Sequence, residues 1–457
     1  MKLNAELIRR YDCHGPRYTS YPTAVQFHTG FNEQHYRRIA LLSNSARPRP
    51  LSIYVHVPFC ARPCFYCGCN KIITRNPAHA EQYLQRLHRE IELQGTLFER
   101  RRSVRQLHFG GGTPTYLTPP QMAALFEQLG RQFNIDHSGQ REFSIEIDPR
   151  TLDEQTLPAL AALGFNRLSL GVQDFDARVQ RAVNRIQSVA QIERCVTQAR
   201  SLGYRSMSFD LIYGLPLQTL ESFGKTLDTV VQMRPDRIAA YGYAHMPRLF
   251  KAQRAIRAEQ LPDADTRLQL LALTVERLTD AGYVYIGMDH FALPDDDLAV
   301  AMRDGSLHRN FQGYSTHGDC DLVGLGISAI GAVGNSYSQN HKHLSAYYQA
   351  LDAGRLPVER GIALSIDDEM RREIIQRLMC NGTLSMRDIE SRYALEFGDY
   401  FGPELSALDA LANDGLVTRD DEFIRITQSG RALLRTVAMV FDAHLRRSAT
   451  MQYSKVI

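Results

Sequence analysis

Six short β-rich runs, each followed by a segment with apolar residues at helical spacing, constrain the fold of this chain more than any other feature. The runs span residues 51–59, 104–111, 141–148, 166–173, 206–214 and 236–245. Strands that alternate with helices predict a parallel sheet with right-handed crossovers. Because a closed TIM barrel has eight such units, we expect an α/β fold with an open, partial (β/α)6 TIM-like barrel.

Each of these strands ends in polar or glycine-rich residues. The strand ends carry the cysteine loop from Cys60 to Cys69, Gly110-Gly-Gly-Thr-Pro114, Glu146, Gln173, Asp210 and Tyr243-Ala-His245. In folds of this kind the chemistry lies at the carboxyl ends of the strands. Loops are polar in general, but that does not explain polar groups at all six ends. We therefore predict one active site at the mouth of the barrel.

The cysteine loop has the spacing C-x3-C-x2-C, formed by Cys60, Cys64 and Cys67, and Cys69 follows two residues later. A [4Fe–4S] cluster normally has four thiolate ligands, so three cysteines on one loop leave one iron open. Zinc is the competing interpretation, but zinc prefers four closed ligands, usually from two separated pairs. The chain has no second C-x2-C pair, and Cys69 beside Cys67 gives a cramped bite. The spacing favours an open cluster.

The glycine-rich segment from Gly110 to Pro114 directly follows the second strand. Consecutive glycines let the backbone approach a ligand and direct N–H and C=O groups toward it. Alone, this segment is compatible with an ordinary tight turn. Beside an iron that is free to chelate an amine and a carboxylate, it suits the amino acid end of S-adenosylmethionine.

Composition limits the class of protein. The 457 residues are 44% hydrophobic and carry a net charge of +3, which indicates a folded core and gives no case for nucleic acid binding. The N-terminus lacks the apolar region of a secretory signal, and no apolar run approaches the roughly 18 residues of a membrane span. We expect a cytoplasmic protein without membrane contact, in which clustered cysteines bind metal rather than form disulfides.

The length predicts one large α/β domain and a smaller unit. We expect residues 1–50 to form an irregular, extended arm, residues 51–355 a catalytic domain, and residues 356–457 a mainly helical C-terminal domain. The arm carries Tyr18 and Tyr21 within Arg-Tyr-Thr-Ser-Tyr-Pro-Thr (17–23). We expect it to cover the barrel mouth, because radical chemistry must be shielded from water.

The C-terminal domain shows three helical patterns, a hairpin pattern at 416–427 and a final helix. This order is similar to a winged helix. Its hairpin tip is Asp420-Asp421, and acidic residues repel phosphates. The pattern therefore favours a scaffold or a lid over DNA binding.

Together, the motifs resemble those of the oxygen-independent coproporphyrinogen III oxidase family of the radical S-adenosylmethionine (SAM) superfamily. They are RYTSYPT, Tyr54-Val-His56-Val-Pro-Phe-Cys60 with the cysteine loop, HFGGGTPTYL, SIEIDP, GFNRLSLGVQDF, DLIYGLP and GMDHFA. The resemblance covers nearly the whole chain and implies a 5′-deoxyadenosyl radical mechanism. The radical takes a hydrogen from the β-carbon of a propionate of coproporphyrinogen III, and loss of CO2 and an electron leaves a vinyl group. Two such reactions give protoporphyrinogen IX for haem biosynthesis.

The resemblance also implies roles for individual residues. The [4Fe–4S] ligands are Cys60, Cys64 and Cys67, and Cys69 matches a cysteine that is needed for activity without ligating the cluster. Positions that line the first, cluster-bound SAM are Tyr54, Gly111, Glu146 and Ile330. Positions around a second SAM are Tyr66, Gly112, Thr113, Gln173, Arg185, Asp210 and Ala244. The substrate has four carboxylates, which call for basic residues, and the candidates are Arg17, Arg185 and Arg309.

Two related functions stay open at this point: a haem chaperone and an anaerobic haem-degrading radical methyltransferase. Chaperones of this superfamily generally lack the Cys67-Gly-Cys69 step and the RYTSYPT arm. The methyltransferase is not expected to share the arm together with the segment from Asn310 to Asp319. This chain has all of these, which favours the oxidase. We further expect a monomer, because no oligomerisation stripe stands out, and an electron donor such as flavodoxin or ferredoxin.

Overall fold

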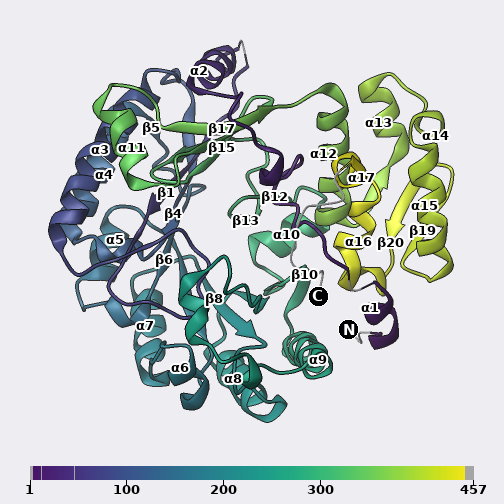
Figure 1. The fold of residues 1–457 in the computed structure, drawn as a ribbon, viewed down its shortest axis with the longest axis horizontal. Helices are drawn as coiled ribbons and strands as arrows, with labels where there is room; N and C mark the ends of the chain where they lie inside the picture. The colour runs from purple at the N-terminus through teal and green to yellow at the C-terminus, as the bar shows by residue number, and fades with distance from the viewer. Residues whose placement is uncertain (1–3, 12, 46, 448–457) are drawn as a thin grey trace.

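The computed structural model describes residues 4–11, 13–45 and 47–447 (Figure 1). All six predicted strands are present and lie side by side. They are β1 (Leu51–Val57), β4 (Ser103–Gly111), β6 (Glu142–Ile147), β7 (Arg167–Gln173), β8 (Ser206–Tyr213) and β9 (Arg237–Gly242). Every neighbouring pair among them is parallel. The expected partial barrel is confirmed.

The sheet is larger than predicted, because strands extend it at both edges. On one side β14 (Asp321–Leu325) pairs parallel with β1, and β15 (Ile330–Val333), β16 (Ser336–Asn340) and β17 (Val358–Ala363) follow in antiparallel order. On the other side β11 (His290–Ala292) pairs antiparallel with β9, and β10 (Val284–Gly287) pairs with β11. Short pairings complete the set: β5 (Asn134–Ile135) with β4, β2 (Phe59–Cys60) with β3 (Ile72–Ile73), and β12 (His308–Asn310) with β13 (Gly313–Ser315).

Helices cover the outer face of the parallel strands (Figure 1). They are α3 (Pro77–Gly95), α4 (Pro119–Gln132), α5 (Thr156–Ala162), α6 (Ala177–Ala182), α7 (Val189–Ser201), α8 (Leu220–Met233) and α9 (Ala264–Asp280). Two more, α10 (Asp297–Arg303) and α11 (Leu344–Asp352), lie beside the edge strands. Thr118 and Thr219 form capping boxes at the starts of α4 and α8, which satisfy N–H groups that the first helical turn leaves open.

Apolar and polar residues alternate along the strands, so that the apolar side chains lie in the core and the polar ones face the barrel interior. In β4, Leu107 and Phe109 are fully buried in the core between sheet and helices, whereas Gln106 and His108 line an internal cavity. Side chains of successive strand residues point to opposite faces, so an apolar outer face and a polar inner face follow from one sequence pattern. A closed TIM barrel fills its interior with branched apolar residues; here the interior is polar.

The C-terminal domain contains the predicted hairpin, β19 (Val417–Arg419) and β20 (Phe423–Ile426), and β18 (Thr383–Ser385) pairs with its second strand. The helices are α12 (Ile366–Asn381), α13 (Met386–Tyr393), α14 (Phe397–Tyr400), α15 (Gly402–Asn413), α16 (Leu434–Met439) and α17 (Ala443–Arg447). This order is that of a winged helix, as expected.

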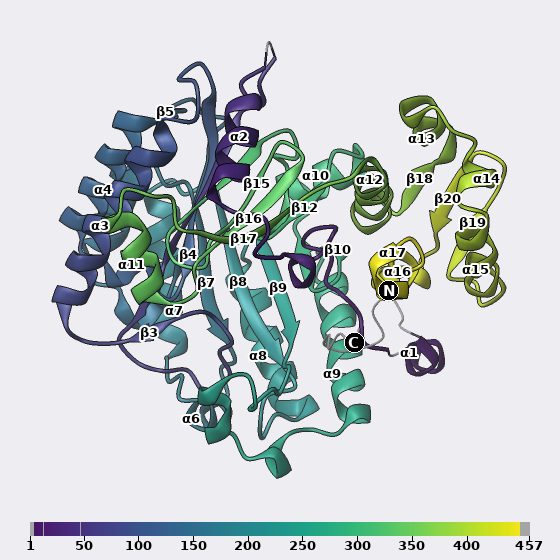
Figure 2. The ribbon, with the colours of Figure 1, turned by 45° about the horizontal axis from the view of Figure 1, so that its top comes forward.

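The prediction of an irregular arm over residues 1–50 is wrong in part. Helices α1 (Ala5–Tyr11) and α2 (Glu33–Leu42) lie in this segment, and Asn32 caps α2 with bonds to the N–H groups of Gln34 and His35. The part between the two helices runs between the barrel and the C-terminal helices (Figure 2). No helix among the described residues is long and apolar enough to span a membrane.

Candidate active site

The cysteine loop follows the carboxyl end of β1, and each predicted cluster ligand on it accepts a hydrogen bond. The Thr113 hydroxyl donates to Cys60 Sγ at 3.4 Å. Arg150 Nη2 and Arg185 Nη1 donate to Cys64 Sγ at 3.3 and 3.6 Å. The backbone N–H of Cys69 donates to Cys67 Sγ at 3.5 Å. Such donors stabilise negative charge on sulfur, so the donor set fits the thiolate ligands of an iron–sulfur cluster.

The two ends of the loop differ in the acidity of their thiols. Hydrogen bonding from Cys69 lowers the pKa of Cys67 to about 5, and Lys71 Nζ lies 3.1 Å from the Cys67 carbonyl oxygen. Burial raises the pKa of Cys60 to about 11. Because metal ligation requires thiolates, binding of a cluster here releases protons, and Cys67 ionises more readily than Cys60.

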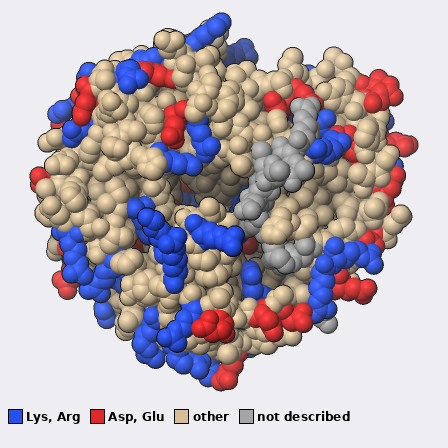
Figure 3. Space-filling model, viewed as in Figure 1, with Lys and Arg blue, Asp and Glu red and all other residues tan. Residues whose placement is uncertain are grey.

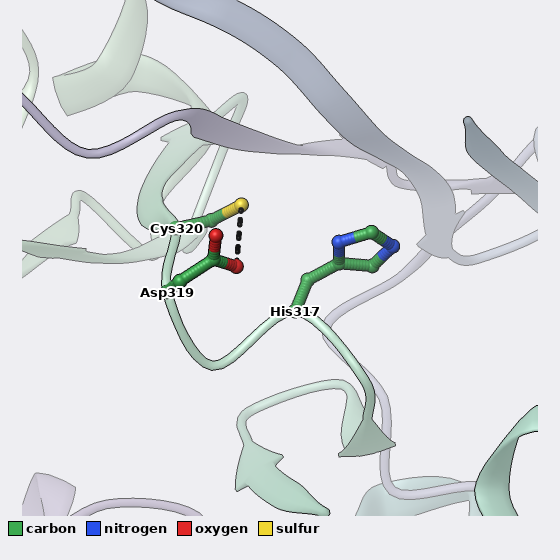
Figure 4. Close-up of side chains that lie close together, drawn as sticks. All are labelled: His317, Asp319 and Cys320. Carbon is green, nitrogen blue, oxygen red and sulfur yellow. Dashed lines mark hydrogen bonds between the residues drawn. The ribbon is translucent and has the colours of Figure 1, made fainter. Parts of the chain in front are cut away.

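The spread of the sulfurs does not suit a single metal ion. Within the described ranges, His317, Asp319 and Cys320 form a group whose ligand atoms all lie within 4.8 Å of one another, close enough to hold one metal ion (Figure 4). The three cysteines of the loop do not meet this spacing, although sulfurs on one tetrahedral zinc would lie only about 4 Å apart. Several irons need ligands that are spread more widely, so the geometry agrees with a cluster.

The group in Figure 4 is remote from the cysteine loop. Asp321, the residue after Cys320, pairs with Leu51 at the start of β1, whereas the cysteine loop follows the end of that strand. Asp319 is also occupied, by Arg105 at 3.3 Å and by the Cys320 thiol at 3.7 Å. These three side chains therefore do not belong to the active site.

The glycine-rich segment is bonded directly to the backbone that leads from β1 into the cysteine loop. The N–H of Gly112 donates to the Val57 carbonyl and the N–H of Thr113 to the Phe59 carbonyl, both at 2.8 Å. A Cβ on Gly112 would lie 2.6 Å from the Pro58 carbonyl group. Gly111 has φ +111°, and a Cβ there would lie 2.6 Å from the His56 ring. Glycine is required because two backbone segments and a ring meet without space for a side chain.

Three of the four residues predicted for the first SAM lie together. Glu146 Oε2 accepts from the N–H of Gly111 at 3.1 Å, and Glu146 Oε1 lies 3.4 Å from His108 Nε2. The ring of Tyr54 stacks on that of His108 at 5.8 Å. Burial alone would raise the pKa of Glu146, but the bonds from His108 and Gly111 hold it below its ordinary value. Glu146 is thus an ionised acceptor at neutral pH.

The fourth residue, Ile330, begins β15. A Cβ on Gly324 would lie 2.8 Å from the Ile330 carbonyl group, and Gly324 faces Tyr54 across the β1–β14 pairing. Ile330 on β15 is therefore separated from Tyr54 on β1 by the single strand β14.

The residues predicted for a second SAM surround the cysteine loop from the other side. Arg185 donates to Asp148 Oδ2 at 3.0 Å and to the Gly171 carbonyl at 2.6 Å, and Gln173 ends β7 with φ +64°. Gln253 Nε2 donates to the backbone carbonyls of Tyr66 at 2.9 Å and Ala244 at 3.2 Å. This one amide holds two predicted site residues, which come from distant parts of the chain, next to each other.

Sequence reasoning assigned no role to Asp148, Arg150, His108 or Gln253. Asp148 accepts from both Arg150 and Arg185, so one carboxylate holds the two arginines that reach Cys64. The signal for Asp148 and His108 was their position in or directly after a strand, within the SIEIDP and HFGGGTPTYL motifs, and Arg150 directly follows the first of these motifs. Gln253 lies in an irregular segment that offers no such signal.

Asp210 faces the barrel interior from β8 and accepts a hydrogen bond from the Ser169 hydroxyl at 3.0 Å. Burial, and next the charge of Glu146, raise the pKa of Asp210 to about 7 from the ordinary 3.8. Between these two values the folded protein holds a proton that the unfolded chain has lost. The contribution of Asp210 to the free energy of unfolding therefore falls as the pH rises from 4 to 7.

In the protein without SAM, Asp210→Asn is expected to remove the loss of stability that Asp210 causes as the pH rises. The variant should gain stability over the unchanged protein as the pH rises from 4 to 8, by at most about 4 kcal/mol in free energy of unfolding. Urea unfolding at several pH values measures the difference, with Asp280→Asn at an exposed position as the matched control. A difference that shrinks with rising pH would contradict the prediction.

An internal cavity of about 120 Å³ lies below these strand ends and is lined by His108, Ser169, Asp210, Tyr241, His290 and Tyr314, among others. On the face shown in Figure 3, a hollow opens near the middle and several Lys and Arg side chains border it. The structure thus combines a mouth with cysteines, a ring of polar strand ends and a polar interior.

Comparisons with known proteins were made for the whole chain. The model of the Radical SAM superfamily matches residues 54–230, and that of the HemN C-terminal domain matches residues 364–433. The chain is 50% identical over 460 residues to the oxygen-independent coproporphyrinogen III oxidase of Pseudomonas aeruginosa, covering 100% of this chain and 99% of that protein. The Escherichia coli oxidase of the same name is 50% identical over 99% of this chain and 98% of its own length. A solved structure of coproporphyrinogen III oxidase (HemN) from Escherichia coli, a radical SAM enzyme, matches with a TM-score of 0.92 at 48% identity, over 97% of this chain and 99% of that one.

Proposed function

The chain belongs to the oxygen-independent coproporphyrinogen III oxidase family of the radical SAM superfamily, and from this premise we propose how its residues perform the reaction. It is an oxidoreductase of haem biosynthesis. Its substrate is coproporphyrinogen III, and oxidative decarboxylation of two propionates to vinyl groups gives protoporphyrinogen IX. The haem chaperone and the methyltransferase are set aside, because the whole-length relatives are oxidases.

One observation supports the assignment of the reactive centre most strongly: every sulfur of the C-x3-C-x2-C loop faces a donor, and the glycine-rich segment is bonded to the same loop. We infer that Cys60, Cys64 and Cys67 hold the [4Fe–4S] cluster. When bound, the cluster supplies the electron that cleaves SAM to a 5′-deoxyadenosyl radical. Asp148 keeps Arg150 and Arg185 against Cys64, which orients the loop and balances its negative charge.

The remaining roles concern SAM and the exclusion of water. We infer that Glu146, ionised and facing Gly111, accepts hydrogen bonds from the first SAM, beside Tyr54 and Ile330. A second SAM is proposed between Tyr66 and Ala244, which Gln253 holds together, with the other contacts from Gly112, Thr113, Gln173, Arg185 and Asp210. Cys69 is proposed to act beside the cluster without ligating it.

The setting of the enzyme is inferred from its chemistry. The seven cysteines from Cys60 to Cys380 are free thiols, which supports a reducing compartment, and we propose the cytoplasm. We further propose a monomer that receives electrons from flavodoxin or ferredoxin.

Anaerobic reconstitution tests the proposed function. The purified chain is loaded with iron and sulfide and mixed with SAM, a reductant and coproporphyrinogen III, and the products are oxidised to porphyrins. We expect the fluorescence of protoporphyrin, and none when SAM is omitted. Stable haem binding without decarboxylation would instead identify a chaperone.

A further inference from the structure

Arg309 is a buried cation without a counter-ion. Arg309 is only 4% exposed. Within the described residues its guanidinium makes no salt bridge, and its Nη1 has no hydrogen-bond partner. Nε donates to the carbonyl of Arg17 at 3.3 Å. An unpaired buried charge costs several kcal/mol, so this arrangement needs an anion that the protein itself does not provide.

Four other buried arginines show the contrast. Arg102 pairs with Asp321, Arg167 with Glu142 and Asp297, Arg185 with Asp148, and Arg371 with Asp367 and Glu404. Each guanidinium has a carboxylate, as is usual for buried charges. Arg309 departs from this rule although the C-terminal domain fixes its backbone. Gln376 of α12 accepts from its N–H at 3.2 Å and donates to its carbonyl at 2.7 Å.

Two more arginines increase the positive charge around this position. Arg17 lies 6.0 Å above the Tyr241 ring and pairs with Asp289 at 2.7 Å. Arg435 of α16 is 5% exposed and donates to the carbonyl of Gly15 at 3.3 Å. Burial, and next the charge of Arg17, lower the pKa of Arg435 to about 10. The arm, the strand β12 and the C-terminal domain thus each contribute one guanidinium to the same region.

The region adjoins the internal cavity below the strand ends. The Arg309 guanidinium stacks on the Tyr314 ring at 4.7 Å, and Tyr314 and His290 line that cavity. Burial, and next the charge of Arg309, lower the pKa of His290 to about 3, so its ring is neutral and adds no cation of its own. Its Nδ1 is buried without a partner in the part of the chain described. Asp210 lines the same cavity at the end of β8, where a SAM is proposed.

We propose that Arg309 binds a propionate carboxylate of the tetrapyrrole substrate, with Arg17 and Arg435 as the surrounding positive charge. The inference rests on the proposed function, and of the three candidates for this role it selects Arg309. Arg185 already binds Asp148 and the cysteine loop, and Arg17 already binds Asp289. A guanidinium with a free nitrogen matches a carboxylate in geometry and charge.

Binding of a stable porphyrin tests the proposal directly. Coproporphyrin III, the oxidised form of the substrate, carries the four carboxylates, and its tetramethyl ester lacks their charge. In the reconstituted holoenzyme, Arg309→Gln is expected to weaken binding of the acid roughly tenfold to a hundredfold, the range for a charge-assisted hydrogen bond. Affinity for the ester should stay unchanged. Arg387→Gln, at a side chain that is 69% exposed, is the control and should bind both porphyrins like the unchanged protein.

Further measurements separate a binding role from a structural one. Arg309→Gln should keep the cluster absorbance and the reductive cleavage of SAM to 5′-deoxyadenosine, and its KM for coproporphyrinogen III should rise by the same factor as its Kd. If this variant fails to take up the cluster, Arg309→Lys tests the proposal in its place. Lysine keeps the charge but not the forked geometry, so binding of coproporphyrin III should weaken a few-fold. Equal affinity for the acid in a folded variant overturns the proposal. If the unchanged protein makes no protoporphyrinogen, the proposed function fails instead.

Discussion

Cys64→Ser is expected to abolish protoporphyrinogen formation, SAM cleavage and the visible absorbance of the reconstituted cluster. Serine is not ionised at neutral pH, and metal ligands of this kind must be deprotonated. The substitution also leaves Arg150 and Arg185, which now donate to the Cys64 sulfur, beside an uncharged hydroxyl. Loss of one of the three predicted ligands should therefore remove activity completely.

Cys195→Ala is the matched control for this variant. Cys195 is buried in the core under α7, 5% exposed, and takes no part in the site. It should cost some stability, about 1 kcal/mol for a small buried group, and leave iron content and turnover per folded enzyme unchanged. Full activity of Cys64→Ser would show that the cluster is held by other residues.

Deletion of residues 1–30 is expected to leave cluster assembly intact and to abolish substrate turnover. The segment contributes Tyr18 and Tyr21 to the core of the C-terminal domain, 2% and 1% exposed. The Tyr18 hydroxyl donates to Asp442 at 2.9 Å, and Tyr21 Oη accepts from the N–H of Ala443 at 3.1 Å. We propose that the arm covers the barrel mouth, and on this proposal its removal exposes a radical formed there to water instead of substrate.

Deletion of residues 1–11 is the control, because this shorter deletion removes α1 but keeps Tyr18 and Tyr21. The ion pairs of α1, Arg9–Asp265 and Arg10–Asp414, lie at half-exposed arginines and should contribute little. Iron content, 5′-deoxyadenosine and protoporphyrin are measured for both truncations. The longer deletion should form 5′-deoxyadenosine without product, and the shorter one should form both. Normal product formation by the longer deletion would contradict the shielding role.

The six parallel strands could be predicted because each is a run of β-branched and aromatic residues bounded by loops. The edge strands could not, since with three to six residues each they are too short to show a clear pattern. In β16, Ser336–Asn340, every residue is buried although the sequence is polar. Its last side chain is satisfied by Glu90 of α3 at 2.6 Å, 250 positions away. Such a partner cannot be found from local pattern.

The site shows the same division between local and distant information. Ligand spacing and the glycine-rich segment are local, and they identified the cysteine loop. The arginines that support it reach Cys64 from 86 and 121 positions away. Helix α2 was missed for another reason: its exposed face made the sequence read as irregular, although Asn32 at its start is a helix-capping residue.

The bond between Tyr18 and Asp442 joins residues 424 positions apart, and this sets an order of events during synthesis. The ribosome makes the arm first and its docking surface last. At about 5–20 residues per second, the cysteine loop leaves the ribosome roughly 20 to 75 seconds before Asp442 does. During that interval Tyr18 lacks its partner in the C-terminal domain. Completion of the chain then provides the surface that fixes this part of the arm.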